Sequence, residues 1–366
     1  MNRAYRIGVV GCGMISETYI RNIQEMFSDT LVVRGVYDRN SEKAQKRAEQ
    51  FALPCCYCSL QQLLEDSQID IVLDLCQPAS HFDVNLQALE AGKHVYSEKP
   101  LAVSFTEGAR LVAFAREKGL RIGCAPDTAL GAMVQTAREL VDAGAIGRMI
   151  GASANLIKQG VESWHPAPDF LYQPGGGPLM DMGPYYLTAL LHIAGPFAQV
   201  EAMDAISFLT RRITSQPRFG EEIRVRVPTY VNALLKFREG GLATFTATFD
   251  VCSSRLPFLE IYGETGTLSL SDPNCFGGRL EMARPGEAFA PIPLRRPYTA
   301  NCRGLGLRDM AAALADGGSS KVDGTYALHI LEVMTAISDS AGDGVRRMLT
   351  TSCQRPTAMA AESVER

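Results

Sequence analysis

The first 125 residues alternate short apolar runs with amphipathic segments. The apolar runs predict strands over residues 5–10, 31–37, 55–58, 69–76, 94–96 and 120–124. The segments between them carry the apolar spacing of helices, over residues 14–27, 41–52, 61–65, 82–91 and 104–118. Strands that alternate with helices are typical of a parallel sheet covered on both faces. We therefore predict an N-terminal, doubly wound α/β domain over residues 1–125.

The pattern changes after about residue 125. Helical spacing predicts helices over residues 131–143, 179–194, 305–315 and 325–341. Strand-like runs occupy residues 150–158, 198–208, 229–238, 241–251, 257–262 and 266–270, with a hairpin turn at 238–241. We predict an α+β domain over residues 126–350 with a large, open and mostly antiparallel sheet. The polar C-terminal tail, residues 351–366, is expected to be a loose end.

Composition and charge narrow the classes of function. The 366 residues are 46% hydrophobic with a formal net charge of −4, which fits two globular domains and gives no basic surface for nucleic acid. No run approaches the ~18 apolar residues of a membrane span, and the first residues lack the layout of a signal peptide. The ten cysteines show neither a disulfide framework nor zinc-ligand spacing. We expect a cytoplasmic protein without a metal ion.

A glycine loop joins the first predicted strand to the first helix. Residues 11–16 read Gly-Cys-Gly-Met-Ile-Ser, a variant of the dinucleotide-binding fingerprint. Gly11 permits the tight turn, and Gly13 lets the backbone approach a pyrophosphate at the helix N-terminus. Asp38 ends the second strand, where a carboxylate accepts hydrogen bonds from ribose hydroxyls and repels a 2′-phosphate. These features predict NAD binding, while the neighbouring Arg39 leaves NADP open.

Further short motifs follow in a fixed order. They are Gln77-Pro78 with His81, Glu98-Lys99-Pro100, the run GGGPLMDMGPY at 175–185, IYGETGT at 261–267 and RGLG at 303–306. In order and spacing, these motifs and the glycine loop resemble the glucose–fructose oxidoreductase, inositol dehydrogenase and MocA (Gfo/Idh/MocA) family over nearly the whole chain. The Glu-Lys-Pro element combined with the glycine-rich aspartate motif makes the resemblance specific.

The resemblance implies a Rossmann domain followed by a domain whose open sheet forms a homodimer or homotetramer. It also implies oxidation of a sugar- or polyol-like secondary alcohol by a nicotinamide cofactor. Many family members carry histidine where this chain has Tyr185, so the chain is most similar to the tyrosine-bearing branch of the family. The resemblance places the cofactor against the following residues: Gly11, Gly13, Met14, Ile15, Asp38, Arg39, Gln77, Pro78, His81, Glu98 and Lys99.

Removal of a hydride from an alcohol requires a base for the hydroxyl proton and positive charge near the developing oxyanion. By resemblance, Lys99 bonds the reacting hydroxyl, and Glu98 orients Lys99 or contacts the cofactor. Asp181 and Tyr185 are four residues apart, so a helix places them on one face, although Pro184 between them should start or kink that helix. Tyr185 is the predicted acid/base, and Asp181 the predicted substrate-positioning residue.

Other residues are also candidates for contact with the substrate. His165 is the rival base, because its ordinary pKa suits proton transfer, and the adjacent Trp164, the only tryptophan, suits stacking on a sugar. Asp127, just after the strand that ends at Cys124, is expected to contact substrate or nicotinamide. The predicted catalytic cleft lies between the two domains.

The leading hypothesis is therefore an NAD(P)-dependent dehydrogenase of a sugar, cyclic polyol or sugar derivative. One alternative is a reductase of a keto-sugar or a dihydrodiol-type ring. A second alternative is a non-catalytic regulator that senses nucleotide and sugar on the same fold. Retention of Lys99, Asp181 and Tyr185 argues against the regulator.

Overall fold

The computed structural model describes residues 4–351 and 353–360. The chain divides into two compact units. The first contains the chain up to Asp127 together with Cys302–Leu331, and the second contains Thr128–Asn301 and the chain from Glu332 onward. The domain boundary predicted between residues 125 and 126 stays a prediction. The structure adds that residues 302–331 pack with the N-terminal unit.

The first unit is built on a six-stranded sheet in which every neighbouring pair is parallel. Its strands are β1 (Tyr5–Val10), β2 (Leu31–Tyr37), β3 (Cys55–Cys56), β4 (Ile71–Asp74), β5 (His94–Ser97) and β6 (Ile122–Cys124). The order β3-β2-β1-β4-β5-β6 is that of a doubly wound fold, which confirms the predicted architecture. The sheet order reverses between β1 and β4, so the loops that follow these two strands diverge and leave room for a ligand.

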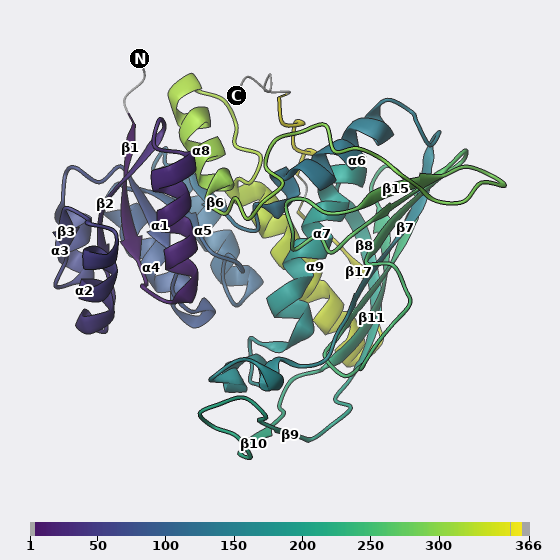
Figure 1. Ribbon diagram of the computed structural model, residues 1–366, viewed down its shortest axis with the longest axis horizontal. Coiled ribbons are helices and arrows are strands. Elements are labelled where there is room, and N and C mark those ends of the chain that lie inside the picture. Colours follow the sequence, from purple (N-terminus) through teal and green to yellow (C-terminus); the bar gives the residue numbers. More distant parts are fainter. Residues whose placement is uncertain (1–3, 352, 361–366) are drawn as a thin grey trace. The chain divides into compact units, whose positions relative to one another are not determined.

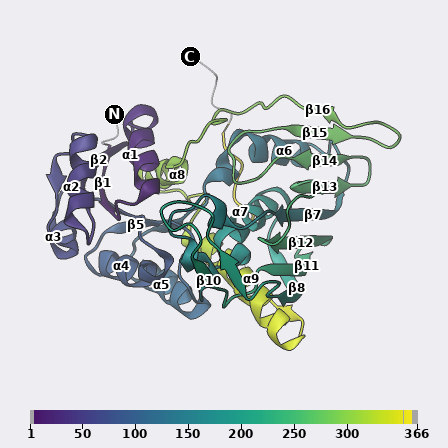
Figure 2. The ribbon, with the colours of Figure 1, turned by 60° about the horizontal axis from the view of Figure 1, so that its bottom comes forward.

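Helices cover both faces of this sheet, and Figure 2 shows α4 and α5 on the side opposite α1. The helices are α1 (Met14–Met26), α2 (Ser41–Gln50), α3 (Leu60–Glu65), α4 (Pro78–Glu90), α5 (Phe105–Glu117), α8 (Leu305–Asp316) and the first part of α9 (Gly324–Asp343). Side chains of Asn40, Ser59 and Ser104 cap three of them. Helix α4 begins four residues before the predicted start at 82, because a proline is well accommodated in the first turn.

The second unit contains a nine-stranded sheet, in the order β16-β15-β14-β13-β7-β12-β11-β8-β17. The strands are β7 (Met149–Ile157), β8 (Phe197–Ala205), β11 (Tyr230–Phe237), β12 (Leu242–Thr248), β13 (Leu259–Gly263), β14 (Thr267–Leu270), β15 (Leu280–Ala283), β16 (Ala290–Pro291) and β17 (Arg347–Met348). Only β12 and β7 pair in parallel, so the prediction of a mostly antiparallel sheet is confirmed. A separate ribbon is formed by β9 (Thr210–Arg212) and β10 (Glu222–Arg224).

Two helices of the second unit, α6 (Ala132–Asp142) and α7 (Gly177–Ala194), lie on one side of the large sheet in Figure 1. Strand β11 shows the resulting alternation: Val231, Ala233 and Leu235 are buried, whereas the residues between them are exposed. The segment that precedes α7 is not an extended loop. It contains two short 3₁₀ turns, η2 (Val161–Ser163) and η3 (Pro168–Tyr172).

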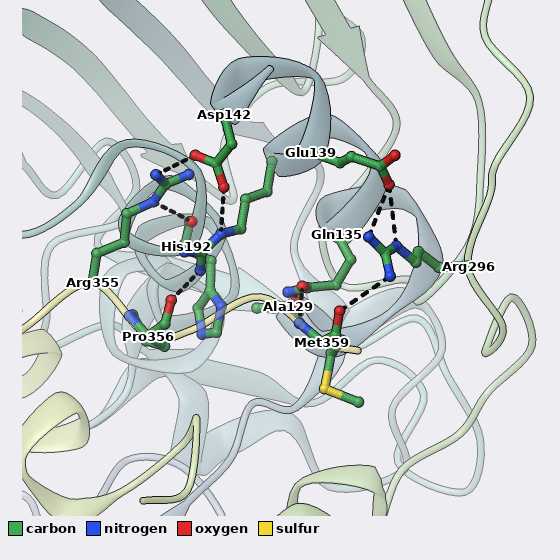
Figure 3. Close-up of polar contacts among 10 residues, drawn as sticks. Ala129, Gln135, Glu139, Asp142, His192, Arg296, Arg355, Pro356 and Met359 are labelled. Carbon is green, nitrogen blue, oxygen red and sulfur yellow. Dashed lines mark hydrogen bonds and ion pairs between the residues drawn. The ribbon is translucent and has the colours of Figure 1, made fainter. Parts of the chain in front are cut away.

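The expectation of a loose C-terminal tail is wrong for residues 353–360, which run across α6 (Figure 3). The Arg355 guanidinium pairs with Asp142 at 2.5 Å and donates to the His192 carbonyl, at the end of α7, at 2.9 Å. The Met359 amide donates to Gln135 at 2.9 Å. Sequence pattern does not identify such a segment because its contacts are polar and its partners are distant in the chain. The remainder of the predicted tail, 352 and 361–366, lies outside the described residues.

We predict that Arg355→Ala lowers the free energy of unfolding by about 2 kcal/mol, because it removes a partly buried hydrogen bond to the His192 carbonyl and an ion pair with Asp142. Thermal or urea unfolding measures the change. Arg346→Ala is the matched control, since it removes an exposed ion pair with Glu201 and should change stability by less than about 0.5 kcal/mol. Equal effects of the two substitutions would contradict an anchoring role for Arg355.

Candidate active site

The glycine loop between β1 and α1 has the geometry of a dinucleotide-binding turn. Gly11 adopts φ +96°, and a Cβ at this position would lie 2.8 Å from the backbone of Leu75, so only glycine fits. Gly13 is exposed, and a Cβ there would meet no described atom within 4 Å. Gly13 is therefore not required by packing within the chain, and its open surroundings suit a ligand. Ser16, in place of the third glycine, is buried and donates to the Gly13 carbonyl at 2.6 Å.

Asp38 follows β2 and is held by two backbone amides. One carboxylate oxygen accepts from the Cys12 amide at 2.7 Å, and the other accepts from Asn40 at 2.8 Å. Each carboxylate oxygen retains accepting capacity, and the side chain is partly exposed. Burial, followed by the nearby Asp38 charge, raises the pKa of the Cys12 thiol to about 12, so this cysteine is an inert part of the loop.

The start of α1 and the residue after Asp38 are open to solvent. Met14 is 70% exposed in the first turn of α1, and Arg39 is exposed as well, whereas Ile15 is half-buried. These side chains border the loop without closing it.

The turn after β5 carries Glu98 and Lys99, both half-buried. Glu98 accepts from the Tyr19 hydroxyl at 2.8 Å through one oxygen and from the Lys99 backbone amide at 3.0 Å through the other. Glu98 thus fixes the backbone of Lys99, one of the two roles predicted for it. Tyr19 is fully buried on α1, and sequence reasoning missed it because an apolar helix face gives no sign of a partner 79 residues away.

The turn after β4 opens α4. Gln77 is exposed at the N-cap and Pro78 occupies the first turn. His81, three residues later, is fully buried, with Nδ1 2.7 Å from the Pro100 carbonyl and Nε2 3.1 Å from the Cys76 carbonyl. Its observed contacts are with backbone, so the direct cofactor contact predicted for His81 stays a prediction.

Asp127 is 1% exposed and caps α8. One carboxylate oxygen accepts from the amides of Gly304 at 2.8 Å and Gly306 at 3.1 Å, where the helix dipole favours negative charge. A Cβ on Gly306 would lie only 2.2 Å from the Tyr96 hydroxyl, so the helix end is packed closely at this point. Asp127 thus serves the fold of the first unit, and its predicted substrate contact remains untested.

In the second unit, α7 carries Asp181 and Tyr185 one turn apart, as their spacing predicts. Asp181 is half-buried and Tyr185 is 8% exposed. The helix begins at Gly177 and continues through Pro184, so the proline does not start it. The neighbouring Tyr186 is fully buried and donates to Asp272 at 3.1 Å, so it packs in the core of the second unit.

His165 lies in an ordered aromatic group with Trp164 and Phe170, whose ring centres are 5.6 and 5.5 Å from that of His165. Its Nδ1 accepts a hydrogen bond from the Ala167 amide at 3.0 Å. A ring nitrogen that accepts carries no proton, so the neutral imidazole carries its proton on Nε2 and presents a donor there. This arrangement disfavours His165 as a base. Trp164 is 64% exposed and available for stacking.

Two further findings concern the described residues, 4–351 and 353–360. In this part of the chain, no group of three or more histidine, cysteine, aspartate or glutamate side chains is arranged to hold a metal ion. Nor is any helix there long and apolar enough to cross a membrane.

Models of known protein families match both units. Residues 5–125 match a model described as an oxidoreductase family with an NAD-binding Rossmann fold. Residues 134–269 match the model of the GFO/IDH/MocA C-terminal domain.

Curated relatives include oxidoreductases of several kinds. A dTDP-3,4-didehydro-2,6-dideoxy-alpha-D-glucose 3-reductase from Streptomyces violaceoruber is 35% identical over 189 residues, 50% of this chain and 53% of the reductase, so the match spans about half of that relative. The mouse trans-1,2-dihydrobenzene-1,2-diol dehydrogenase is 27% identical over 81% of this chain and 83% of its own length. A D-glucoside 3-dehydrogenase from Escherichia coli is 27% identical over 67% and 70%.

Solved structures share the fold. Levoglucosan dehydrogenase in complex with NADH superposes with a TM-score of 0.83 at 20% identity, over 95% of this chain and all of that chain. The WlbA dehydrogenase from Bordetella pertussis, in complex with NADH and UDP-GlcNAcA, gives a TM-score of 0.76 at 24% identity over 96% and 100%.

The buried carboxyl of Asp127 predicts a pH-dependent contribution to stability. Burial raises its pKa from 3.8 to about 6, so the folded state binds this proton more tightly than the unfolded state. The contribution of Asp127 to stability should therefore increase as the pH falls from 7 to 5, by about 1 kcal/mol. Asp127→Asn removes this pH-dependent contribution to stability, because asparagine does not titrate.

Urea unfolding of both proteins at pH 5, 6 and 7 measures the effect. The stability of the wild type relative to Asp127→Asn should rise as the pH falls. A difference that is constant over this range would show that Asp127 does not titrate there.

Proposed function

Because the chain belongs to the Gfo/Idh/MocA oxidoreductase family and has its NAD-binding Rossmann domain, we propose that it transfers a hydride between NAD and a secondary alcohol of a sugar, cyclic polyol or sugar derivative. The observation that carries the proposal is the convergence of the glycine loop, Asp38 and the Glu98–Lys99 turn. Each follows a strand of one parallel sheet, so all three lie at its carboxyl edge, where doubly wound folds bind their ligands.

In this proposal, NAD binds to the groups at the carboxyl edge of the parallel sheet. The open surroundings of Gly13 and the N-terminus of α1 receive the pyrophosphate. Asp38, already oriented by two amides, accepts from the ribose hydroxyls, and its charge disfavours a 2′-phosphate. Bound NAD supplies the hydride acceptor. Met14, Ile15, Arg39, Gln77 and Pro78 border this site.

For the reaction itself, we assign roles to three residues. The Lys99 ammonium stabilises the oxyanion that develops as the hydride leaves, and Glu98 holds the Lys99 backbone in place for this purpose. Tyr185, as the phenolate, accepts the hydroxyl proton in oxidation, and as the phenol it returns that proton in reduction. Asp181, one turn earlier on α7, bonds a second substrate hydroxyl.

His165 receives a different role from Tyr185. Its Nδ1 is occupied by the Ala167 amide, so a proton could be accepted there only after that hydrogen bond is broken. We assign its Nε2–H as a donor to a substrate oxygen, beside the exposed face of Trp164.

A reductase of a keto-sugar or a dihydrodiol-type ring is the second candidate. It is favoured by the names of two relatives, the streptomycete 3-reductase and the mouse dihydrodiol dehydrogenase. The same residues would serve it, since each proton and hydride step is reversible.

We further propose that two copies associate through the open face of the nine-stranded sheet, in the cytoplasm, where ten cysteines would stay reduced. On this face Met203, Leu234 and Leu242 are 80, 59 and 64% exposed, in three adjacent strands. Polar residues such as Glu201 and Thr244 flank Leu234 in register. Apolar side chains interspersed with polar ones suit a subunit interface.

We predict that Lys99→Met lowers kcat at least 10³-fold while NADH binding stays within about threefold, because the lysine acts on the reacting oxygen and not on the adenosine half. Asp38→Ala is the matched variant and should weaken NADH binding about tenfold. Fluorescence titration with NADH and turnover on a panel of sugars and polyols, with NAD and NADP, measure both. Near-normal turnover of Lys99→Met would refute the proposal.

The subunit interface gives a separate prediction. Leu234→Arg should convert the wild-type oligomer to monomers in light scattering, because burying a charged side chain in an apolar interface has a desolvation cost that a pair with the neighbouring Glu201 does not repay. Met26→Arg, an exposed position at the end of α1, is the control and should leave the mass unchanged. A monomeric wild type, or an unaltered mass for Leu234→Arg, would exclude this interface.

A further inference from the structure

The ring of His81 connects the two turns that carry the candidate cofactor and catalytic groups. It lies in the first turns of α4 and is 0% exposed. Its Nδ1 is 2.7 Å from the carbonyl oxygen of Pro100, the residue after Lys99. Its Nε2 is 3.1 Å from the carbonyl oxygen of Cys76, in the turn after β4.

Both partners of the ring are acceptors, so the ring must donate to them. A ring with a proton on each nitrogen donates to both carbonyls, and a neutral ring donates to one at a time. No apolar side chain could replace these bonds, because two carbonyl oxygens would then lose a buried partner. The two contacts therefore tie both turns to one side chain.

A buried carboxylate supports the same turn from the other side. Asp74, the last residue of β4, is 0% exposed and accepts from the Cys76 amide at 2.9 Å through Oδ1. Its Oδ2 has no hydrogen-bond partner among the described residues. Burial raises the pKa of this carboxyl, and the nearby His81 opposes that shift. Asp74 and His81 thus hold Cys76 by its amide and its carbonyl.

We propose that His81 is a positioning residue that sets Lys99 in register with the turn at residues 75–78, without touching substrate. Lys99 is then held from both sides, by Glu98 at its amide and by His81 through the carbonyl of Pro100. Chemistry of this kind is sensitive to small displacements of the reacting group, because orientation contributes much of the rate. The proposal rests on the role of Lys99 proposed above.

Two substitutions of His81 each remove one contact of the ring and retain the other. The amide nitrogen of asparagine stands where Nδ1 stands, so His81→Asn retains the bond to Pro100 and loses that to Cys76. The amide nitrogen of glutamine stands nearer to Nε2, so His81→Gln retains the bond to Cys76 and loses that to Pro100.

We expect the two His81 variants to affect different kinetic constants. His81→Gln should lower kcat about tenfold and leave the KM for NAD within about threefold, because only the Lys99 turn is released. His81→Asn should raise the KM for NAD about tenfold and leave kcat within about threefold, because only the turn that faces the cofactor is released. Steady-state kinetics, with NADH titration as a check on KM, measure both.

His94→Asn is the matched control. His94 starts β5 at the end opposite Lys99, and its Nδ1 accepts from the Arg121 amide at 3.0 Å. We expect unchanged kcat and KM for this variant. The proposal is overturned if both His81 variants show the same combination of lower kcat and higher KM. It is also overturned if neither variant differs from the wild type in kcat or in KM. If Lys99→Met keeps its turnover, the proposed function fails instead, whatever the His81 variants show.

A measurement on the unaltered protein covers the case in which neither His81 variant folds. With ¹⁵N-labelled histidines, the ring N–H of His81, assigned through its sequential connectivities because His192 and His329 are buried as well, should exchange slowly with solvent. Rapid exchange of the His81 ring protons would contradict the proposed role of His81.

Discussion

Parallel pairing of the six strands in the first unit is the constraint on which the candidate site depends. It brings the ends of β1, β2, β4 and β5 to one edge, although the residues that follow them span positions 11 to 99. None of these strands could be reversed without moving its loop to the opposite edge. Gly11, Asp38 and Lys99 therefore lie at the same edge of the sheet, and the local sequence around each needs only to provide the right group.

Backbone groups do most of the positioning at that edge. Asp38 binds two amides, Glu98 binds the Lys99 amide, Asp127 binds two amides of α8, and His81 faces two carbonyls. Side chain to backbone contacts of this kind hold a turn without requiring a particular side chain on it.

The sequence was sufficient for the architecture and for the presence of an NAD-binding domain. Alternating strand and helix periods predict the parallel sheet, and the glycine loop with Asp38 predicts the NAD-binding edge. The short strands β9, β10, β15, β16 and β17 were missed, because their two to four residues do not belong to longer apolar runs of the kind that marked the other short strands. The anchored tail was missed for a related reason, since its bonds connect Arg355 and Met359 to residues more than 160 positions earlier.

In the candidate site, the type of a residue does not by itself indicate whether the residue binds a ligand or supports the fold. Asp127 and His81 have the chemistry of catalytic or binding groups and stand at strand ends or first helical turns, where such groups occur. Their burial and their backbone partners give them supporting roles in the structure. A sequence cannot separate the two cases, because the difference lies in which way a side chain turns from the same backbone position. The separation comes from burial: Asp127 and His81 are at most 1% exposed and bond to the protein's own backbone, whereas Asp38, although it also binds two amides, is partly exposed and can serve a ligand.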